Sequence, residues 1–322
     1  MYINAASTIS HQPTFQNAGF SKLIEPLDNS SDLISPNYKE YIDAGLLRRM
    51  SKILRMSVAA AKDCLKQAEI EQPEAIIVGT GLGCLQDTEK FLNTFLSVEG
   101  LLPPTSFIQS THNTIAGQIS LSIGNHGYNM THTQNTLSFE HALIDTLLLL
   151  GEGKDDIITG AADEYIEFLD EAADQLNLHS KHNFTSGASF FILSNDKKDS
   201  SVARIKDVTT IGLVQDIDEE IDSFLSANFL NVSEIDLILY ADFNAKGSMD
   251  SVAHKYFNEH YHADSKIINY TKLSGLYPTN SAFAMHYAVD KIQQHPELKN
   301  VLILNGLNKI NLGLTLIESL EA

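Results

Sequence analysis

The sequence predicts an α/β fold with two related halves, and three observations carry that prediction. Short apolar segments alternate with amphipathic segments along most of the 322 residues, as strands and helices do when they pack in layers. Turns rich in glycine and polar residues separate these segments. The order of segments starts again after the polar stretch 195–200. Because the chain is also longer than most single domains, we expect one half over 1–200 and the other over 201–322.

The first half contains a strand at its start and a helix after each of several turns. Strands are expected in the apolar runs at 2–9, 74–83, 127–134, 155–164 and 187–194. Helices are expected at 38–70, 87–98, 105–124 and 138–153. Apolar residues recur at helical spacing in the first of them. Asp87 is expected to cap the second helix, and the fourth is expected to end at Gly151 or Gly153.

The second half repeats this order of elements. Strands are expected at 201–213, 235–243, 266–271, 300–308 and 312–319, and helices at 220–229, 248–261 and 281–294. The last two strands are expected to pair. The acidic run 216–222 is interpreted as a solvated helix start, where the helix dipole favours carboxylates.

The composition argues against several classes of partner. There are 22 Lys and Arg against 41 Asp and Glu, so the formal net charge is 22 − 41 = −19. Nucleic acid and anionic membranes both recruit Lys and Arg, so we expect neither as a partner. No apolar run approaches the roughly 20 residues of a membrane span, and the start of the sequence lacks a signal-peptide pattern. Two cysteines, Cys64 and Cys84, fit a reducing cytoplasm, where we expect the protein.

A glycine-rich turn at 79–84 has the setting of a dinucleotide-binding loop, because it follows a strand and precedes a helix. Gly79, Gly81 and Gly83 follow the spacing G-x-G-x-G, which lacks the third glycine of the fingerprint. Glu99 stands about 20 residues further on, but at the end of a helix and not at the tip of a second strand. We therefore favour a tight turn over a nucleotide site.

Cysteine and histidine give two further candidate sites. Cys84 could act as a thiol nucleophile at a helix N-terminus, where the dipole lowers a thiol pKa. For Cys84 and Cys64 alike, a small buried apolar residue is the favoured interpretation. His260 and His262 could bind a metal, but no third ligand is evident, so a solvated helix end is favoured. We expect no metal and no cofactor.

The stretch 129–150 raises a sharper question. A strand stops in a polar run and a helix begins at once, and such corners commonly seat a catalytic nucleophile. This corner holds Gln134, Asn135 and Thr136, with no cysteine and no serine elbow.

The order of short motifs resembles that of the β-ketoacyl synthase family, which has the thiolase fold. The similar segments are RRMSKILRMSVAAAKDCL, IIVGTGLGCLQDTEKF, STHNTIAGQISLSIGNHG, GEGKDDIITGAADE and GASFFILS. The resemblance spans nearly the whole chain. It implies two related βαβαβαββ halves in a five-layered α-β-α-β-α arrangement.

The resemblance also implies that the catalytic centre is incomplete. Active members of the family use one Cys and two His. Within 134–136, Asn135 aligns best with the Cys, Asp242 stands at the first His, and Leu276 or Tyr277 stands at the second. The terminal glycine-rich loop that helps to form the oxyanion hole reads GLNKIN at 306–311. This loss is coherent, so we interpret the corner as an inherited part of the fold and of a dimer seam.

One branch of the family has this character. Chain length factor subunits of type II polyketide synthases lack the Cys, often carry Gln there, and show Ala-Asp at the first His, which Gln134, Ala241 and Asp242 resemble. Such a subunit pairs with an active ketosynthase and shapes its acyl tunnel. The segments SFEHALIDTLLL and YPTNSAFA are most similar to subunits of aryl polyene or flexirubin-type pigment pathways.

The same resemblance suggests how the chain assembles. The strand at 128–134 is expected to pair antiparallel across a two-fold or pseudo-two-fold axis, in a heterodimer or homodimer. Side chains near this seam are expected to bound the partner's acyl tunnel; the candidates are Phe107, Ile108, Met130, Leu137 and Phe139. The acidic acyl carrier protein is expected to dock on the partner, because a chain at −19 repels it. The basic residues Arg48, Arg49, Lys52 and Arg55 are interpreted as the polar face of a helix.

Two other functions stay open. The chain could be a stand-alone enzyme that processes acyl or malonyl groups: a decarboxylase that uses Gln134 or Asn135 as an amide oxyanion donor, an atypical acyltransferase, or a thiol enzyme that uses Cys84. It could also bind a nucleotide through Gly79, Gly81 and Gly83.

Overall fold

The computed structural model describes residues 1–28, 31–102, 104–176, 183–241, 266–307 and 311–320. Asp242, His260, His262 and the expected helix 248–261 lie outside these ranges, as does part of the loop 306–311. All described strands belong to one ten-stranded mixed sheet in the order β3-β2-β4-β5-β1-β6-β10-β9-β7-β8.

The sheet has two halves with the same strand order. The first half contains β1 (Tyr2–Ile9), β2 (Ala75–Gly79), β3 (Tyr128–His132), β4 (Ile157–Asp163) and β5 (Gly187–Ser194). The second contains β6 (Ala203–Gly212), β7 (Leu237–Tyr240), β8 (Lys266–Asn269), β9 (Asn300–Leu307) and β10 (Asn311–Glu318). In each half, the second strand pairs in parallel with the third and the fourth, and the fifth pairs antiparallel with the fourth and the first.

The two halves join where the start of β1 pairs with the start of β6. The element order therefore restarts between β5 and β6, as the sequence predicts. The boundary at residue 200 stays a prediction, because the sheet itself is continuous across this join.

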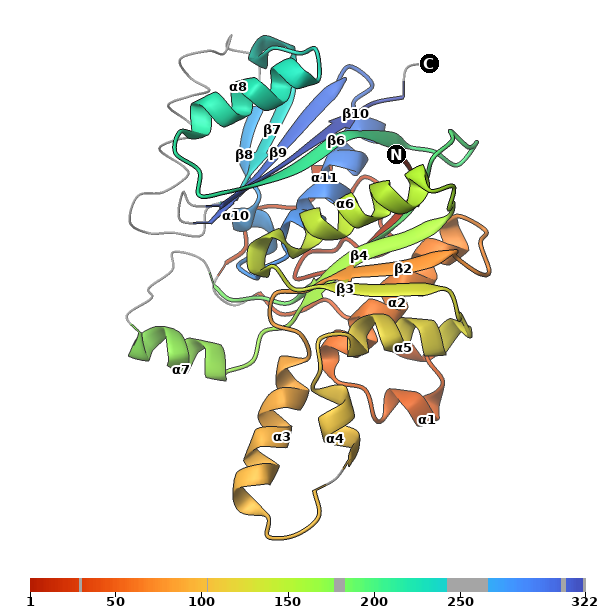
Figure 1. Cartoon of the computed structure of the whole chain (residues 1–322), viewed down its shortest axis with the longest axis vertical. Helices are drawn as coiled ribbons and strands as arrows, with labels where there is room; N and C mark the ends of the chain where they lie inside the picture. The colour runs from red at the N-terminus through yellow and green to blue at the C-terminus, as the bar shows by residue number, and fades with distance from the viewer. Residues whose placement is uncertain (29–30, 103, 177–182, 242–265, 308–310, 321–322) are drawn as a thin grey trace.

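Helices form three layers around the two halves of the sheet (Figure 1). The outer layer on the first half contains α2 (Lys52–Gln67) and α5 (Thr114–Ile123). The middle layer contains α6 (Ser138–Gly151) and α11 (Ser281–Gln294), which contact strands of both halves. The outer layer on the second half contains α8 (Ile217–Ala227). These layers are the α-β-α-β-α arrangement that the family resemblance implies.

The core follows these layers. Phe139, Phe191, Phe283 and Ile303 pack in the middle, between the two halves of the sheet. A second cluster fills the space under α2 and α5, and a third lies under α8. Because α6 and α11 are buried on most sides, their apolar residues are not confined to one stripe.

Some expected elements differ from the structure. The helix expected at 38–70 is divided into a short 3₁₀ turn (Tyr38–Glu40), α1 (Ala44–Leu47) and α2. The helix expected at 105–124 is divided into α4 (Pro104–Gln109) and α5. In the helix expected at 38–70, the backbone of Ser51 is extended, at φ −67° and ψ 172°, and it separates α1 from α2. A helix that the sequence did not predict, α7 (Phe168–Gln175), follows β4, and α10 (Thr271–Ser274) follows β8.

The cap of α3 (Leu85–Ser97) is also different from the prediction. Cys84 occupies the N-cap position, and Asp87 lies inside the first turn. The carboxylate that does cap this helix is the distant Glu164, which accepts from the backbone N–H of Gln86 at 2.9 Å and from that of Ile53, in the first turn of α2, at 3.2 Å. One buried side chain thus satisfies unpaired N–H groups of two helices.

Candidate functional site

The corner between β3 and α6 has a specialised backbone. Asn135 lies at φ +55°, in the left-handed region that few residues other than glycine adopt. Asparagine tolerates this conformation better than most residues. The side chains of Gln134 and Asn135 are exposed, whereas Thr136 and Leu137 are buried. The backbone thus presents the side chains of residues 134 and 135 outward, while neither of them is a thiol.

Glycines in the turn after β2 allow this corner to pack closely. A Cβ atom on Gly79 would lie 2.5 Å from the backbone oxygen of Ser138, and one on Gly81 would lie 2.3 Å from Cβ of Pro278. The turn therefore needs glycine for contact with the corner and with the second half. This explains the G-x-G spacing without a bound nucleotide.

The amides of the same turn are already occupied. The backbone N–H groups of Gly81 and Leu82 donate to the Asp163 carboxylate at 3.0 and 2.8 Å, and that of Gly83 donates to Oγ1 of Thr80 at 2.9 Å. A phosphate site needs such groups to be free. The nucleotide-binding alternative therefore has no support in this geometry.

Asp163 links the two halves of the molecule at this end of the sheet. It is fully buried and also accepts from the backbone N–H and the hydroxyl of Thr279, at 3.1 and 2.7 Å. Thr80 donates a further hydrogen bond at 3.0 Å. Burial raises the pKa of Asp163, and the hydrogen bonds from Thr279, Leu82, Thr80 and Gly81 oppose that shift. Its role is structural, since the surrounding donors fill its acceptor positions.

A second buried polar group, Asn305 on β9, connects the corner to the second half of the sheet. The side-chain amide of Asn305 donates to the backbone oxygen of Thr136 at 2.7 Å and to Oε1 of Glu140 at 2.9 Å. Burial raises the pKa of Glu140 to about 7. Oε2 of Glu140 and the hydroxyl of Tyr270 have no hydrogen-bond partner among the described residues. The corner is therefore tied to β9, which belongs to the second half.

The residues expected at the second His position do not supply a base. Leu276 is buried and pairs through its backbone with Asn183 and Thr185. Tyr277 is also buried, and its hydroxyl has no hydrogen-bond partner among the described residues. Burial, and then the charge of Asp163, raise the pKa of Tyr277 above its usual value. Its phenol is therefore neutral at physiological pH and poorly suited to accept a proton.

The structure separates the tunnel candidates into two groups. Phe107, Ile108 and Met130 are 57%, 62% and 40% exposed. Leu137 and Phe139 are buried, and Phe139 packs against Phe191 with ring centroids 5.8 Å apart. The first group can therefore face a partner directly, whereas the second belongs to the core of this chain.

Neither cysteine has the surroundings of a nucleophile. Cys64 is buried and donates to the backbone oxygen of Phe190. Cys84 is buried as well, and burial raises its pKa, with smaller contributions from Glu164 and Asp87. His112 does approach the neighbouring Gly83, but a buried thiol of raised pKa carries little thiolate.

Across the described ranges, no group of three or more His, Cys, Asp or Glu side chains is placed to hold a metal ion. None of the helices in them combines the length and the apolar character that a transmembrane span requires.

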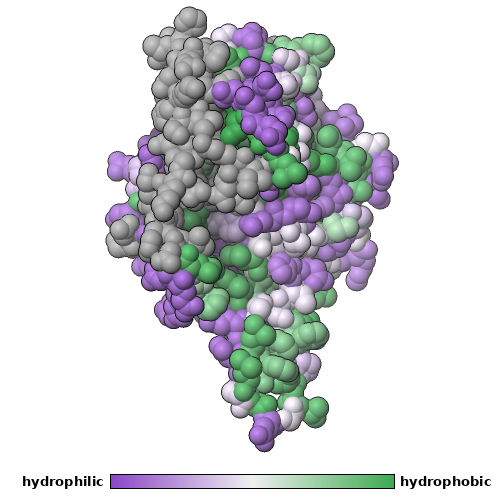
Figure 2. Space-filling view, turned by 60° about the vertical axis from the view of Figure 1, so that its left-hand side comes forward, coloured by the Kyte–Doolittle hydropathy of each residue, from purple (hydrophilic) through white to green (hydrophobic). Residues whose placement is uncertain are grey.

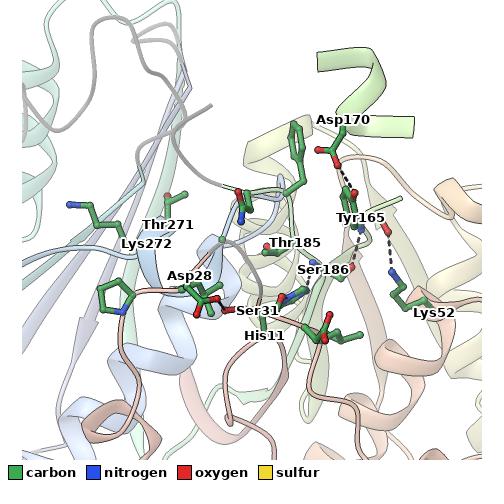
Figure 3. A pocket seen from close by; sticks show the side chains of 17 residues that line it. His11, Asp28, Ser31, Lys52, Tyr165, Asp170, Thr185, Ser186, Thr271 and Lys272 are labelled. Atoms are coloured by element: carbon green, nitrogen blue, oxygen red, sulfur yellow. Dashed lines mark hydrogen bonds between the residues drawn. The ribbon is translucent and has the colours of Figure 1, made fainter. Parts of the chain in front are cut away.

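A polar pocket of about 730 Å³ is lined by residues of both halves, among them His11, Tyr165 and Lys272 (Figure 3). His11 lines it with both ring nitrogens engaged: Nδ1 lies 2.7 Å from the backbone oxygen of Ser31, and Nε2 accepts from the N–H of Ser186 at 3.2 Å. Lys52 donates to the backbone oxygen of Tyr165 at 3.0 Å. The pocket has the volume of a small-molecule site, but its histidine is not free to act as a base.

Sequence reasoning missed the buried polar residues that assemble this region. Asp163 ends the apolar strand β4 and Glu164 follows it, and that position was the available signal, whereas Asn305 lies inside the apolar strand β9. Their partners lie 78 to 169 residues away along the chain, so no local pattern identifies the contacts.

Comparison with known proteins agrees with this architecture. Residues 30–206 match the family model described as the β-ketoacyl synthase, N-terminal domain. A search among curated protein sequences found no match.

Several solved structures are similar over almost the whole chain. The ishigamide ketosynthase/chain length factor has 13% identity and a TM-score of 0.79, with 99% of each chain covered. A ketosynthase (ApeO) in complex with its chain length factor (ApeC) from Xenorhabdus doucetiae has 12% identity and a TM-score of 0.76, covering 99% of this chain and 98% of that one. A β-ketoacyl synthase from Burkholderia phymatum STM815 has 11% identity and a TM-score of 0.78, with 99% of each chain covered. At these identities the likeness shows a shared fold.

Proposed function

Because this chain belongs to the β-ketoacyl synthase family, we propose that it is a ketosynthase-like subunit of the chain length factor type, without a catalytic centre of its own. The observation that carries the proposal is the corner between β3 and α6. Its backbone is complete and closely packed, yet Gln134, Asn135 and Thr136 stand where a nucleophile would be. A side-chain amide cannot form an acyl thioester, so the first step of a condensation has no acceptor on this chain.

The rest of the site supports the same conclusion. Leu276 and Tyr277 offer no base at the second His position, and Asp242, at the first, is a carboxylate by sequence. The two cysteines are buried and free, which also favours a cytoplasmic location. None of the residues at the aligned positions is therefore a Cys or a His.

The proposed partner is an active β-ketoacyl synthase. Two similar structures are named as a ketosynthase with a chain length factor. In this chain β3 is the last strand of the sheet and has no neighbour on one side among the described residues. An open strand edge promotes association, so we propose that β3 pairs antiparallel with the equivalent strand of the ketosynthase.

Apolar side chains flank this edge and would be covered with it. Leu121 on α5 is 75% exposed, Met130 on β3 is 40% exposed, and Leu148 on α6 is 62% exposed. We expect an obligate interface of more than ~2,000 Å² in total. Met130, Phe107 and Ile108 are the side chains that can bound the partner's acyl tunnel from this surface. Extension of an aryl polyene-type chain is the proposed reaction of the pair.

Two measurements test the proposal. Purified protein alone, incubated with malonyl carrier protein and followed by mass spectrometry, should leave the malonyl group unchanged. Co-expression with the ketosynthase-type chain encoded beside it should yield a stable pair by pull-down and sedimentation. A monomer at micromolar concentration that captures no such chain would contradict the proposed function.

One second candidate has a specific observation in its favour. The amides of Gln134 and Asn135 are exposed at the corner, where they could donate to a developing oxyanion in a decarboxylation. Steady loss of carbon dioxide from malonyl carrier protein, abolished by Gln134→Ala, would support this candidate over the purely structural role.

A further inference from the structure

An arm formed by α3 and α4 projects from the first half of the molecule (Figure 1). The arm includes the loop 98–102, and few of its residues are buried. Only Asp87 is buried in the 13 residues of α3, and only Ser106 in the 6 residues of α4. The two helices contact each other, with the rings of Phe91 and Phe107 5.4 Å apart.

The arm exposes a continuous set of large apolar side chains, and Figure 2 shows this surface at the narrow end of the molecule. Leu92, Phe95 and Leu96 follow the i, i+3, i+4 spacing of one helix face and are 51%, 58% and 80% exposed. Leu101 in the loop is fully exposed. A soluble protein rarely leaves so large an apolar patch uncovered unless it is an interaction site.

The arm would also be more stable if a partner buried its apolar face. A helix of about 12–15 residues is marginal in water on its own, and most helices in proteins are stabilised by burial of an apolar face. α3 has such a face, but apart from the contact of Phe91 with α4 most of it is left uncovered, and none of its apolar side chains is fully buried. The base of the arm is anchored by hydrogen bonds from Thr88 to Ser110 and from Gln109 to Arg49, each 3.0 Å long. These hydrogen bonds fix the end of the arm that adjoins the rest of the chain, and they do not reach the loop 98–102 at its far end.

The arm is continuous with the proposed seam. α4 leads within a few residues into α5, and α5 packs against β3, the open edge of the sheet. We propose that the arm reaches across this seam and that its apolar face docks in an apolar groove of the same ketosynthase partner. This inference rests on the proposed function and adds a second contact surface to it.

Other occupants fit the surface less well. An anionic membrane would be repelled by a chain with a net charge of −19. The arm itself is also net acidic, because it carries Asp87, Glu89 and Glu99 but only one basic residue, Lys90. A second copy of this chain would present the same acidic surface, and it supplies no active site for the complex to serve.

The test compares binding to the co-expressed ketosynthase-type chain. The double variant Phe95→Ser, Leu96→Ser removes two exposed apolar side chains from the arm. The matched control Leu213→Ser, Phe229→Ser removes two from the second half, which are 75% and 94% exposed. We expect the arm variant to bind the partner at least ~10-fold more weakly, equivalent to 1.4 kcal/mol, while the control stays within about twofold of the wild type.

A second measurement does not depend on the folding of a variant. Amide hydrogen exchange of residues 85–109 in the unaltered protein should slow when the partner is bound, whereas α8 should be unchanged. Equal affinity of the arm variant and the wild type, or unchanged exchange at 85–109, would overturn the inference.

The remaining outcomes separate this inference from the proposed function. If Met130→Asp weakens the pair and the arm variant does not, the proposed function stands and the arm inference is wrong. If the wild type captures no ketosynthase-type chain, both are wrong. If the arm variant reduces only self-association, the arm belongs to contacts between copies of this chain, and the inference is again overturned.

Discussion

At the scale of single residues, the most unusual groups are buried carboxyls. Glu140 and Glu164 both have pKa values raised to about 7, chiefly by burial. Each is held by hydrogen bonds that connect separate elements: Glu140 by Asn305, and Glu164 by the N–H groups of Gln86 and Ile53. Neither lies at the exposed corner, so their effect should appear in stability and not in a reaction.

A pH dependence of stability follows from Glu140. Its pKa in the folded protein is about 7 and its ordinary value is 4.5, so the folded state binds the extra proton between these values. Its contribution to the free energy of unfolding is complete below pH ~4.5 and is lost as pH rises toward ~7, by roughly 1–3 kcal/mol. Glu140→Gln should reduce this slope, measured by denaturant unfolding at several pH values. An identical slope in the variant would contradict the assignment.

The glycine contacts give a second prediction. Gly81→Ala places a Cβ atom 2.3 Å from Pro278 and should destabilise the protein by about 1–3 kcal/mol, because packed atoms yield little. Gly117→Ala is the matched control, since it lies in α5 with no atom within 4 Å of the added Cβ. It should stabilise the helix by up to about 1 kcal/mol. Thermal unfolding of both variants measures the difference in their stability. Equal effects of the two substitutions would argue against the close contact between Gly81 and Pro278.

At the scale of elements, the important distinction is between the edge strand β3 and the buried helix α6. They are joined by the corner, but they place their apolar side chains in different surroundings. Met130 lies on the open edge, whereas Phe139 lies in the core against Phe191. From the sequence, Met130 and Phe139 are both expected near one seam. An apolar residue in a strand and one in the first turn of a helix cannot be told apart as exposed or buried from their hydrophobicity alone.

The two positions should respond differently to truncation. Phe139→Ala should cost about 3–5 kcal/mol of stability, as for other buried aromatic residues, and is measured by unfolding of the isolated subunit. Met130→Ala should leave that stability nearly unchanged and should lengthen the products of the reconstituted pair, since a smaller wall admits a longer chain. Product mass spectrometry checks the second effect. Unaltered product length with Met130→Ala would remove this residue from the tunnel wall.

At the scale of the whole molecule, charge and shape suggest that this chain binds the partner ketosynthase and that the partner binds the acyl carrier protein. The net charge of −19 repels an acidic carrier protein over distances of about 8–10 Å at cellular salt. Arg48 and Arg49 are exposed, but they lie outside α2, so the basic residues 48–55 do not form the face of one continuous helix. The apolar arm and the open strand edge instead favour contact with a partner protein.

Charge reversal tests this division of roles. Arg48→Glu, Arg49→Glu should leave binding of the acyl carrier protein to the reconstituted pair within about twofold of the wild type, because the partner provides the basic surface. Titration calorimetry at low and physiological salt measures it. Abolished binding would show that the carrier protein docks on this chain.

The sequence by itself determined the α/β class, the restart of the element order and the absence of a cysteine or serine at 134–136. These features are local. Strands such as β5, and helices such as α11, are long enough and apolar enough to be recognised from spacing alone. The identities of Gln134, Asn135 and Thr136 need no structure to be read.

The tertiary structure alone decided how the pieces are joined. It divided the expected helix at 38–70, because Glu164 caps a new start at α2 from more than 100 residues away. It showed that Asp163 connects the turn after β2 to Thr279 in the second half, that Asn305 connects the corner to β9, and that Phe139 belongs to the core. Hydrogen bonds and packing between distant residues depend on the folded path of the chain, which no local period of the sequence specifies.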